Sequence, residues 1–399
     1  MKYVVVIIDG ASGWPCDELG GLTTLEAART PHLDALARTG TVGLSQTVPA
    51  GMEPSSAIAC MSVLGFDPAR YYAGRGPIEA MALGIDLEVG QAALRCNLVT
   101  VLDGVMRSYA GGNIPSVESH PIIADLQAAL GDDRVAFHPG VNFRHILTVR
   151  DGSDLLSTRC AAPHDITDRA VADHLPEGPA AALLLDLMER SKTLLAKHLV
   201  NRVRAARGDL PVTQIWPFWP GLQAVPMPGF RETYGRRAAL TSAVDLLRGL
   251  AKQAAIDFLD IAGVTDGDDN DYEGQMAGAL AALVDRDVVI VHVEAPDAAG
   301  HEGDAVKKVS AVEKVDALMV PQVTALGAGV RLLVQPDHPT PLALKTHVVE
   351  PVPFVLWGAG VEANGATAYS ETQAAATGVS VVPGYRLMSM FLGSGRPGN

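Results

Sequence analysis

Acidic and imidazole side chains follow the ends of three short apolar runs in this sequence. They are Asp9, Asp297, His301, Asp337, His338 and, nine residues further on, His347. Open α/β sheets bind ligands beyond the carboxyl ends of their strands, and parallel strands bring those ends to one edge. A turn or helix cap would explain Asp9 alone, so the interpretation depends on the whole set.

Three carboxylates and three imidazoles form a mixed set of oxygen and nitrogen ligands. Such a set suits Mn²⁺, Zn²⁺ or Co²⁺ better than Mg²⁺, which prefers oxygen ligands. Six ligands are too many for one tetrahedral ion but suit two ions roughly 3.5–4 Å apart. Two divalent ions would bring four positive charges against three carboxylates. The resulting cationic centre would attract phosphate.

A candidate nucleophile lies in the Ser55-Ser56 pair, just before an apolar run. A serine at a helix start meets free backbone N–H groups and the positive end of the helix dipole, which favour an alkoxide or a phosphate. An ordinary helix N-cap explains the same pattern, and the pattern alone favours that reading. The sequence contains no P-loop, no H-E-x-x-H and no nucleophile-elbow motif around this pair.

The elements that must position these residues alternate along the chain. Nearly continuous apolar runs predict buried strands at residues 3–8, 287–293, 331–334 and 353–356. Helical patterns cover residues 24–39, 56–64, 238–253, 272–284 and 305–327. Strands that alternate with helices predict an α/β fold with a largely parallel sheet.

The pattern changes between residues 91 and 164. Strands are expected at residues 93–101, 105–109 and 143–149, and a helix at 116–130. We therefore predict a core formed by residues 1–90 and 165–399, with an inserted α+β domain at 91–164. Residues 210–230, rich in Pro and Trp, predict a surface loop, and the tail at 393–399 is expected to fray.

Composition excludes several classes of protein. Apolar types make up 48% of the 399 residues and charged types 19%, which predicts a packed core rather than disorder. The net charge of −14 argues against nucleic acid or anionic membrane as a partner. Four dispersed cysteines, no signal-like start and no long apolar run predict a cytoplasmic protein. The sequence makes no prediction of the oligomeric state.

Specific motifs run through most of the chain. They include Ile8-Asp9-Gly10, Leu19-Gly20-Gly21-Leu22-Thr23-Thr24, Leu64-Gly65-Phe66-Asp67-Pro68, Gly74-Arg75-Gly76-Pro77, Arg95-Cys96-Asn97, Phe143-Arg144-His145, Pro163-His164-Asp165-Ile166, Ala295-Pro296-Asp297, Gly300-His301-Glu302-Gly303-Asp304, Pro336-Asp337-His338-Pro339-Thr340-Pro341 and Lys345-Thr346-His347. With these motifs the sequence resembles the cofactor-independent phosphoglycerate mutases of the archaeal type, within the alkaline phosphatase superfamily. The resemblance implies an alkaline-phosphatase-like core with a mostly parallel sheet, helices on its faces and a small inserted domain.

The resemblance also implies a metal-dependent isomerase of glycolysis and gluconeogenesis. One divalent ion would be held by Asp297, His301 and His347. A second would be held by Asp9, Asp337, His338 and the oxygen of Ser56. Mn²⁺ is the first choice, with Zn²⁺, Co²⁺ or Mg²⁺ as alternatives, and no bisphosphoglycerate cofactor is needed. The phosphoryl group of a small substrate, 3-phosphoglycerate, would move to Ser56 and then to the 2-hydroxyl of glycerate.

Cationic groups in the same motifs are the implied clamps for the carboxylate or phosphate of the substrate. They are Arg75, Arg95, Arg144, His145 and Lys345. For each arginine, a surface salt bridge is the alternative. The inserted domain would close over the substrate and keep water from the phosphoserine.

Three residues depart from the family pattern near the nucleophile and in the insert. Ala57 stands where Asp is usual, Cys60 where Asn or His is usual, and Asn113 where a His is expected. These departures keep other functions open on the same scaffold: a homoserine kinase-like phosphotransferase, a metal-dependent phosphatase, or an inactive metal-binding regulatory protein.

Overall fold

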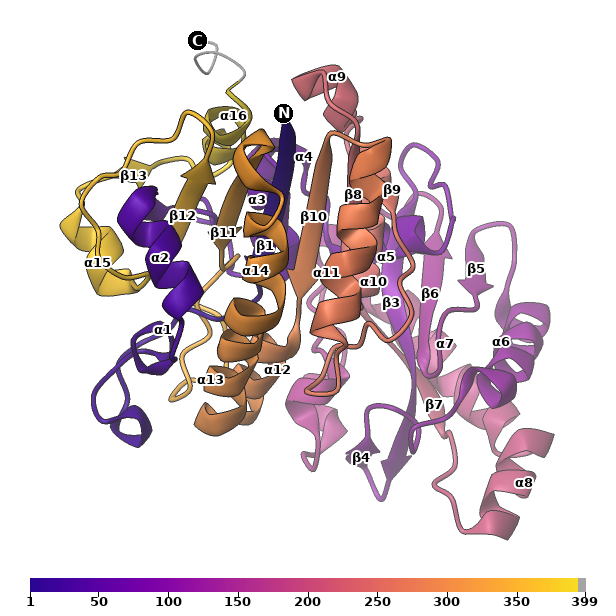
Figure 1. The fold of residues 1–399 in the computed structure, drawn as a ribbon. Coiled ribbons are helices and arrows are strands. Elements are labelled where there is room, and N and C mark those ends of the chain that lie inside the picture. The colour runs from indigo at the N-terminus through magenta and orange to yellow at the C-terminus, as the bar shows by residue number, and fades with distance from the viewer. Residues whose placement is uncertain (394–399) are drawn as a thin grey trace. The chain divides into compact units, whose positions relative to one another are not determined.

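The computed structural model describes residues 1–393 and divides the chain into two compact units (Figure 1). Met1–Tyr72 and Pro226–Asn399 form the core unit, and Ala73–Val225 form the inserted unit. The inserted unit is larger than the expected 91–164, because flanking helices on both sides pack against its own sheet. The C-terminal tail is expected to fray over residues 393–399, and residues 394–399 of it lie outside the described part of the chain.

The core unit is built on an eight-stranded sheet. In spatial order its strands are β13 (Ser380–Val381), β2 (Thr41–Ser45), β12 (Val352–Gly358), β11 (Val330–Gln335), β1 (Lys2–Ile8), β10 (Val288–Val293), β8 (Ala238–Thr241) and β9 (Asp257–Phe258). Only β12 runs antiparallel to its two neighbours, β11 and β2. The α/β class with a mostly parallel sheet is therefore confirmed.

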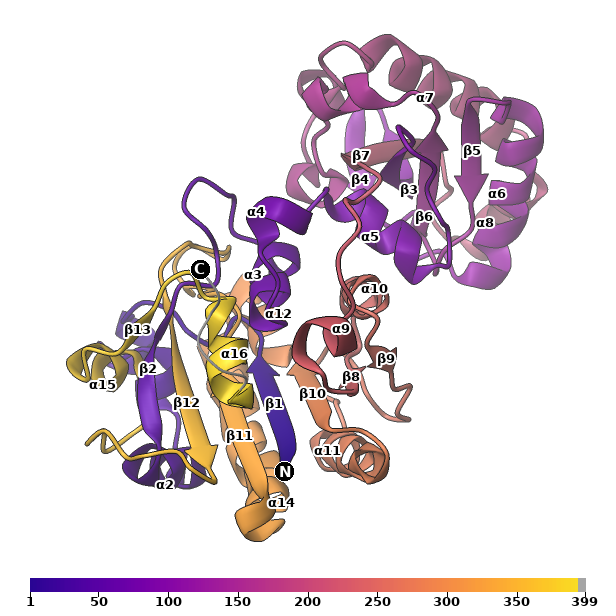
Figure 2. The same cartoon turned by 90° about the horizontal axis from the view of Figure 1, so that it is seen from above.

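Helices cover both faces of this sheet. Figure 2 shows α2, α11 and α14 on one face and α3, α10 and α16 on the other. Val4, Val6 and Ile8 of β1 belong to an apolar cluster with residues of the first set of helices, whereas Tyr3 packs edge-on against Phe391 of α16 at 5.4 Å. Burial on both faces explains why the central strands read as continuous apolar runs.

The helices of the core unit are short. Their bounds are α1 (Thr24–Ala27), α2 (Pro31–Thr39), α3 (Ser56–Val63), α4 (Pro68–Tyr71), α9 (Phe230–Tyr234), α10 (Asp245–Gln253), α11 (Tyr272–Ala281), α12 (Ala295–Glu302), α13 (Ala305–Lys314), α14 (Val320–Thr324), α15 (Glu371–Ala376) and α16 (Arg386–Leu392). A π-helical turn, Val315–Met319, joins α13 to α14. The expected helix over residues 24–39 is two helices, since Pro31 begins the second of them.

The inserted unit has a separate, antiparallel sheet. Its strands are β3 (Ala92–Leu102), β4 (Val105–Ser108), β5 (Val135–His138), β6 (Arg144–Val149) and β7 (Gln214–Leu222), and its helices are α5 (Arg75–Ala82), α6 (Ser116–Leu130), α7 (Ala181–Leu195) and α8 (Leu199–Arg207). β3 lies between β6 and β7. A second apolar core forms between this sheet and α6 and α7.

Two further sequence predictions are wrong. The single helix predicted over residues 238–253 is a strand, β8, followed by α10, because the apolar segment 238–241 pairs in parallel with β10. The loop predicted over residues 210–230 contains β7, whose Trp216 and Phe218 are buried. β7 pairs only with β3, and such an edge strand tolerates prolines, whose missing N–H groups can face outward.

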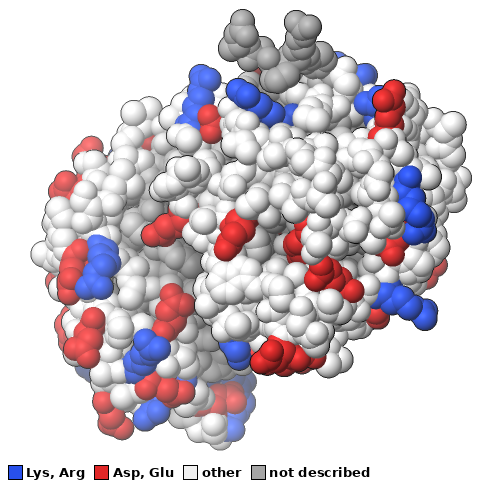
Figure 3. Space-filling view, turned by 90° about the vertical axis from the view of Figure 1, so that its left-hand side faces the viewer, with Lys and Arg blue, Asp and Glu red and all other residues white. Residues whose placement is uncertain are grey.

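The surface view in Figure 3 shows acidic and basic side chains interspersed over one face, with wide areas that carry neither. No continuous basic stripe of the kind that tracks nucleic acid crosses that face. Within residues 1–393, no helix is both long and apolar enough to cross a membrane.

Candidate metal centre

The carboxyl ends of three neighbouring strands meet at one edge of the core sheet. β1 lies between β10 and β11 and runs parallel to both, with Ile8 opposite Val293. Asp9 follows β1 directly, Asp297 lies in the first turn of α12 just after β10, and Asp337 lies two residues beyond β11. The parallel register therefore brings these three acids together, although Asp9 and Asp337 are more than three hundred residues apart in the sequence.

Gly10 lets the backbone approach this edge closely. Its φ is +60°, and its N–H donates to Asp337 Oδ1 at 3.2 Å. A Cβ atom at this position would lie 2.3 Å from Asp297 Oδ1 and 2.7 Å from Thr340 Oγ1. Both the left-handed conformation and the lack of space require glycine here.

The first predicted ligand set converges around Asp297. His301 lies one turn later on α12, with its Nε2 3.2 Å from Asp297 Oδ2. His347 Nε2 lies 2.9 Å from His301 Nε2 and 3.6 Å from Asp297 Oδ1. His301 Nδ1 is 2.9 Å from the carbonyl of Lys345, which can only accept. When the His301 ring is neutral, this contact places its proton on Nδ1. The lone pair on Nε2 is then directed at Asp297 and His347.

The second predicted set converges around His338. Its Nε2 lies 3.3 Å from Asp337 Oδ2, 3.5 Å from Asp9 Oδ1 and 3.2 Å from Ser56 Oγ. Asp9, Asp337 and His338 are fully buried. Each of the three offers a ligand atom within 4.8 Å of the other two.

The two sets differ in their electrostatics. Burial raises the pKa of Asp9 well above its ordinary value, and the Asp337 carboxylate raises it further. Burial also opposes ionisation of Asp297, but hydrogen bonds with His301 and His347 hold the pKa of Asp297 well below its ordinary value. In return, the hydrogen bond to Asp297 raises the pKa of His301 to about 9. Hydrogen bonds with imidazoles thus favour the ionised form of Asp297, whereas burial and nearby carboxylates disfavour the ionised form of Asp9.

The residues fit divalent cations. Asp9 Oδ1 is buried and accepts no hydrogen bond within residues 1–393, although an unpaired buried carboxylate oxygen is costly. Its other oxygen contacts His292 at 2.8 Å. Carboxylate oxygens and imidazole nitrogens that converge in this way match the ligands of Mn²⁺, Zn²⁺ or Co²⁺. The structure brings the predicted residues together, and their role as ligands remains a prediction.

The two adjacent serines have different roles in the structure. Ser55 is the N-cap of α3, and its side chain accepts a hydrogen bond from the N–H of Ile58 at 3.4 Å. Ser56 is therefore the first helical residue, and its hydroxyl contacts His338 instead. The N-cap pattern and the nucleophile pattern are both present, on neighbouring residues.

Sequence reasoning missed a chain of contacts behind Asp9. His292 in β10 lies with its Nε2 2.8 Å from Asp9 Oδ2 and its Nδ1 3.0 Å from Ser242 Oγ. His292 is buried, and burial lowers its pKa to about 4, so the ring is neutral. An imidazole inside an otherwise apolar strand was the available signal. Asp9, His292 and Glu294 form a further group of ligand-type atoms within 4.8 Å of one another.

The predicted substrate-binding arginines lie in the inserted unit and are tied to a buried acid. Glu79 Oε1 accepts from Arg75 Nε at 2.9 Å, and Glu79 Oε2 accepts from Arg95 Nη1 at 2.8 Å. The Arg75 guanidinium also stacks over Trp219, 4.0 Å from the ring centroid. These contacts use Nε of Arg75 only, so its two Nη groups make no hydrogen bond within the described residues.

The other predicted substrate groups have different surroundings. Arg144 lies over Phe143, with its guanidinium carbon 5.8 Å from the ring centroid. His145 is buried, burial lowers its pKa to about 3, and its Nδ1 accepts from the N–H of Gly140. Lys345 belongs to the core unit. Its Nζ donates to the carbonyl of Glu302 at 2.9 Å, while its own carbonyl contacts His301.

The departures from the family pattern have clear structural places. Ala57 is buried in the first turn of α3. Cys60, also buried, donates its thiol hydrogen toward Asp337 Oδ2 at 3.4 Å, and burial raises the pKa of this thiol well above its ordinary value. Asn113 adopts a φ of +55°, a conformation that Asn tolerates better than most residues.

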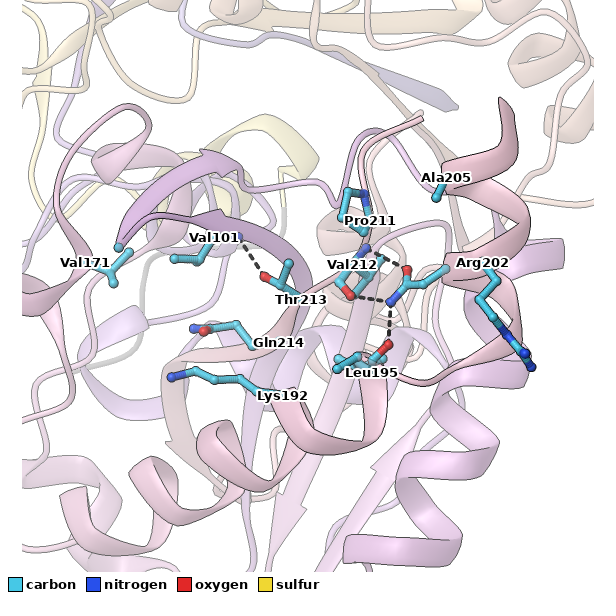
Figure 4. A pocket seen from close by; sticks show the side chains of 13 residues that line it. Val101, Val171, Lys192, Leu195, Arg202, Ala205, Pro211, Val212, Thr213 and Gln214 are labelled. Atoms are coloured by element: carbon cyan, nitrogen blue, oxygen red, sulfur yellow. Dashed lines mark hydrogen bonds between the residues drawn. The ribbon is translucent and has the colours of Figure 1, made fainter. Parts of the chain in front are cut away.

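A cavity of about 650 Å³ lies in the inserted unit. Its walls come from β3, β7, α7 and α8 and the nearby loops, and are mainly apolar (Figure 4). The amide of Asn201 is fully engaged by Leu195 and Val212, and the hydroxyl of Thr213 bonds to the Val101 N–H. The cavity contains none of the predicted site residues.

Comparison with protein families and curated proteins gives consistent results. A family model described as 2,3-bisphosphoglycerate-independent phosphoglycerate mutase matches residues 37–201. A protein of that name from Methanothrix thermoacetophila is 42% identical over 396 residues, which cover 98% of this chain and 100% of the relative. The Methanosarcina barkeri protein of the same name is 40% identical over 397 residues, covering 98% of this chain and 99% of the relative.

Two solved structures share the fold. The PH0037 protein from Pyrococcus horikoshii aligns with a TM-score of 0.82 at 24% identity and covers 100% of this chain and 99% of its own. A cofactor-independent phosphoglycerate mutase from Thermoplasma acidophilum aligns with a TM-score of 0.63, also at 24% identity, and covers 98% of this chain and 99% of its own.

Proposed function

The chain belongs to the family of 2,3-bisphosphoglycerate-independent phosphoglycerate mutases, and we propose that it interconverts 3-phosphoglycerate and 2-phosphoglycerate through a phosphoserine on Ser56. The observation that carries this proposal is the place of the Ser56 hydroxyl. It lies 3.2 Å from His338 Nε2 at the start of α3, while Ser55 caps the helix.

Two divalent ions are part of the proposal. Asp297, His301 and His347 would hold one ion, and Asp9, Asp337, His338 and Ser56 the other. When bound, the ions, for which we propose Mn²⁺, supply a lower pKa for the Ser56 hydroxyl and stabilise charge on the transferring phosphoryl group. No bisphosphoglycerate is required, since Ser56 itself carries the phosphoryl group between the two positions.

The transfer is balanced at the residues of the chain. The bond between Ser56 Oγ and phosphorus forms as the bond from phosphorus to the 3-oxygen of glycerate breaks, and the serine proton leaves for that oxygen. Glycerate then reorients, the bond from its 2-oxygen to phosphorus forms as the bond from phosphorus to Ser56 Oγ breaks, and the proton of the 2-hydroxyl passes to Oγ. The N-terminal turn of α3 favours the negative charge that collects at Oγ.

Three arginines and the neutral His145 of the inserted unit would bind the substrate. We propose that Arg75, Arg95, Arg144 and His145, together with Lys345 of the core unit, hold its carboxylate or phosphate. Two arginines surround the single Glu79, so one positive charge is left over for an anion. The free Nη groups of Arg75 can form a bidentate contact with it.

We also propose a cytoplasmic location and a single small phosphorylated partner. All four cysteines are free thiols, and two of them, Cys60 and Cys96, are buried, as is usual for a protein of a reducing compartment.

One assay distinguishes the proposed function from its alternatives. Protein reconstituted with Mn²⁺ is incubated with 3-phosphoglycerate, and both 2-phosphoglycerate and inorganic phosphate are followed. A mutase forms 2-phosphoglycerate without ATP, without a bisphosphoglycerate primer and without release of phosphate. Release of phosphate alone identifies a phosphatase, consumption of ATP only with an amino-alcohol acceptor identifies a kinase, and no reaction contradicts an enzymatic role.

A further inference from the structure

One buried hydroxyl contacts both predicted ligand sets. Thr340 follows Asp337 and His338 in the loop after β11 and is completely buried. Its Oγ1 lies 2.5 Å from Asp297 Oδ1 and 3.3 Å from His338 Nδ1. Thr340 therefore touches one residue of each set without belonging to either.

The donors and acceptors around this hydroxyl fix the tautomer of His338. A threonine hydroxyl has one hydrogen, and the Asp297 carboxylate can only accept it. Thr340 must then accept from His338, so the His338 ring carries its proton on Nδ1. The Nε2 atom is left with a free lone pair, facing Ser56, Asp9 and Asp337. Burial lowers the pKa of His338, which is consistent with a neutral ring.

The backbone of Thr340 is held from several sides. Its carbonyl accepts from the ammonium group of the buried Lys308 at 2.6 Å, and its N–H donates to the carbonyl of Ser12 at 3.0 Å. A Cβ on Gly300 would lie 2.8 Å from Thr340 Cγ2. The side chain is thus fixed by packing and by hydrogen bonds, as expected where a group must orient its neighbours.

We propose that Thr340 is a positioning residue that orients Asp297 and holds His338 in its Nε2-free tautomer, so that one hydroxyl couples both ion sites. The inference rests on the proposed function only in assuming that these residues hold the ions. Loss of the hydroxyl should weaken both sites at once, although Thr340 itself binds neither ion.

The chain offers a matched control in Ser242. Its hydroxyl contacts His292 Nδ1, and of the proposed ligands His292 contacts Asp9, at 2.8 Å. Ser242→Ala also removes one buried hydroxyl, but its effect should be limited to the ion beside Asp9.

The test titrates the full-length apo protein with Mn²⁺ alone in a calorimeter. Thr340→Val should weaken both binding steps by about 10- to 100-fold, the usual range for such supporting partners, Thr340→Ser should restore both, and Ser242→Ala should weaken one. Thr340→Val with one or both steps unchanged would overturn the inference. If the wild type binds two ions but does not convert 3-phosphoglycerate, the proposed function fails while this comparison still stands.

A second measurement is made on the wild-type protein, so its outcome does not require that a variant folds. In ¹⁵N-labelled, metal-free wild-type protein, the ring nitrogens of His338 should report a protonated Nδ1 and an unprotonated Nε2. Thr340→Ser should keep this pattern. A proton on Nε2 of His338 in the wild type would overturn the inference.

Discussion

The core unit and the inserted unit handle buried charge in opposite ways. At the edge of the core sheet, Asp9 and Asp337 lie side by side in the interior, and Asp9 Oδ1 accepts no hydrogen bond within residues 1–393. In the inserted unit, Glu79 is also buried, but two arginines pair with it. The first cluster leaves a buried carboxylate oxygen without a hydrogen-bond donor in the described part of the chain, whereas the second is internally paired and keeps one positive charge in excess.

The comparison shows that the surroundings of a buried acid indicate its purpose. A buried acid that is paired within the fold stabilises the structure and positions its partners. Its substitution should therefore lower the free energy of unfolding. A buried acid that is left unpaired destabilises the metal-free protein. Its substitution should therefore change the ion content and the activity. Variants in the two units should therefore differ in the property that they lose.

The largest effect is expected at Ser56. Ser56→Ala removes the oxygen that we propose carries the phosphoryl group, so kcat should fall by about 10⁴-fold or more, while elemental analysis still finds two ions per chain. Ser55→Ala is the matched control, since it removes the helix cap and should cost about 1 kcal/mol of stability with most activity retained. Substantial turnover by Ser56→Ala would refute the nucleophile assignment.

Removal of one ligand should come next. Asp297→Ala and His347→Ala should each lose one of the two ions, because each breaks the set around α12, and activity should fall with it. Elemental analysis of dialysed protein measures the ion content. Glu302→Gln, on the same helix but pairing outward with Lys307, should keep both ions. An unchanged ion count in both alanine variants would contradict the ligand set.

In the inserted unit, the expected effect is on stability. Glu79→Gln leaves Arg95 buried without its carboxylate, which should cost about 3–5 kcal/mol in the free energy of unfolding, measured by denaturant titration. Mn²⁺ content should not change. Glu88→Gln, which breaks the exposed pair with Arg150, should cost less than about 1 kcal/mol. A loss of ions in Glu79→Gln would break the division between the two units.

The contribution of Glu79 to stability should depend on pH, and this effect should be smaller than the preceding ones. Burial opposes ionisation of Glu79, but Arg95 and Arg75 outweigh it and lower the pKa of Glu79 below its ordinary 4.5. A carboxyl with a lowered folded pKa stabilises the fold fully above its unfolded pKa and loses that contribution as pH falls through the folded value. The stability difference between wild type and Glu79→Gln should therefore narrow below pH 4.5, in denaturant titrations at several pH values. A constant difference would argue against the pairing.

Much of the core site follows from local sequence patterns. Asp9, Asp297 and Asp337 come just after strands that are nearly continuously apolar, and the rule for parallel sheets places such residues at one edge. The contacts of Ser242 and Thr340 could not be predicted in this way. They depend on strand register and on a loop that folds back, and both are properties of the tertiary structure.

The inserted unit was harder to predict for a physical reason. Its sheet is antiparallel, and β7 carries Pro217 and Pro220, which suggest a loop when the sequence is read alone. A strand is compatible with those prolines because β7 lies at the sheet edge and pairs with β3 alone. The pair of Arg95 with Glu79 likewise joins a strand to a separate helix, and no short motif indicates it.

Gly10 has a consequence for protein engineering. Since even a methyl group there would collide with Asp297, the spacing of the carboxylates at this edge of the sheet depends on the absence of a side chain at residue 10. In a library randomised at residue 10, active clones should carry glycine almost without exception. At Gly20 and Gly21, an added Cβ would meet no atom within 4 Å. These two positions should accept asparagine or aspartate. The substitutions tolerated at residues 10, 20 and 21 would therefore show which of these glycines the fold requires.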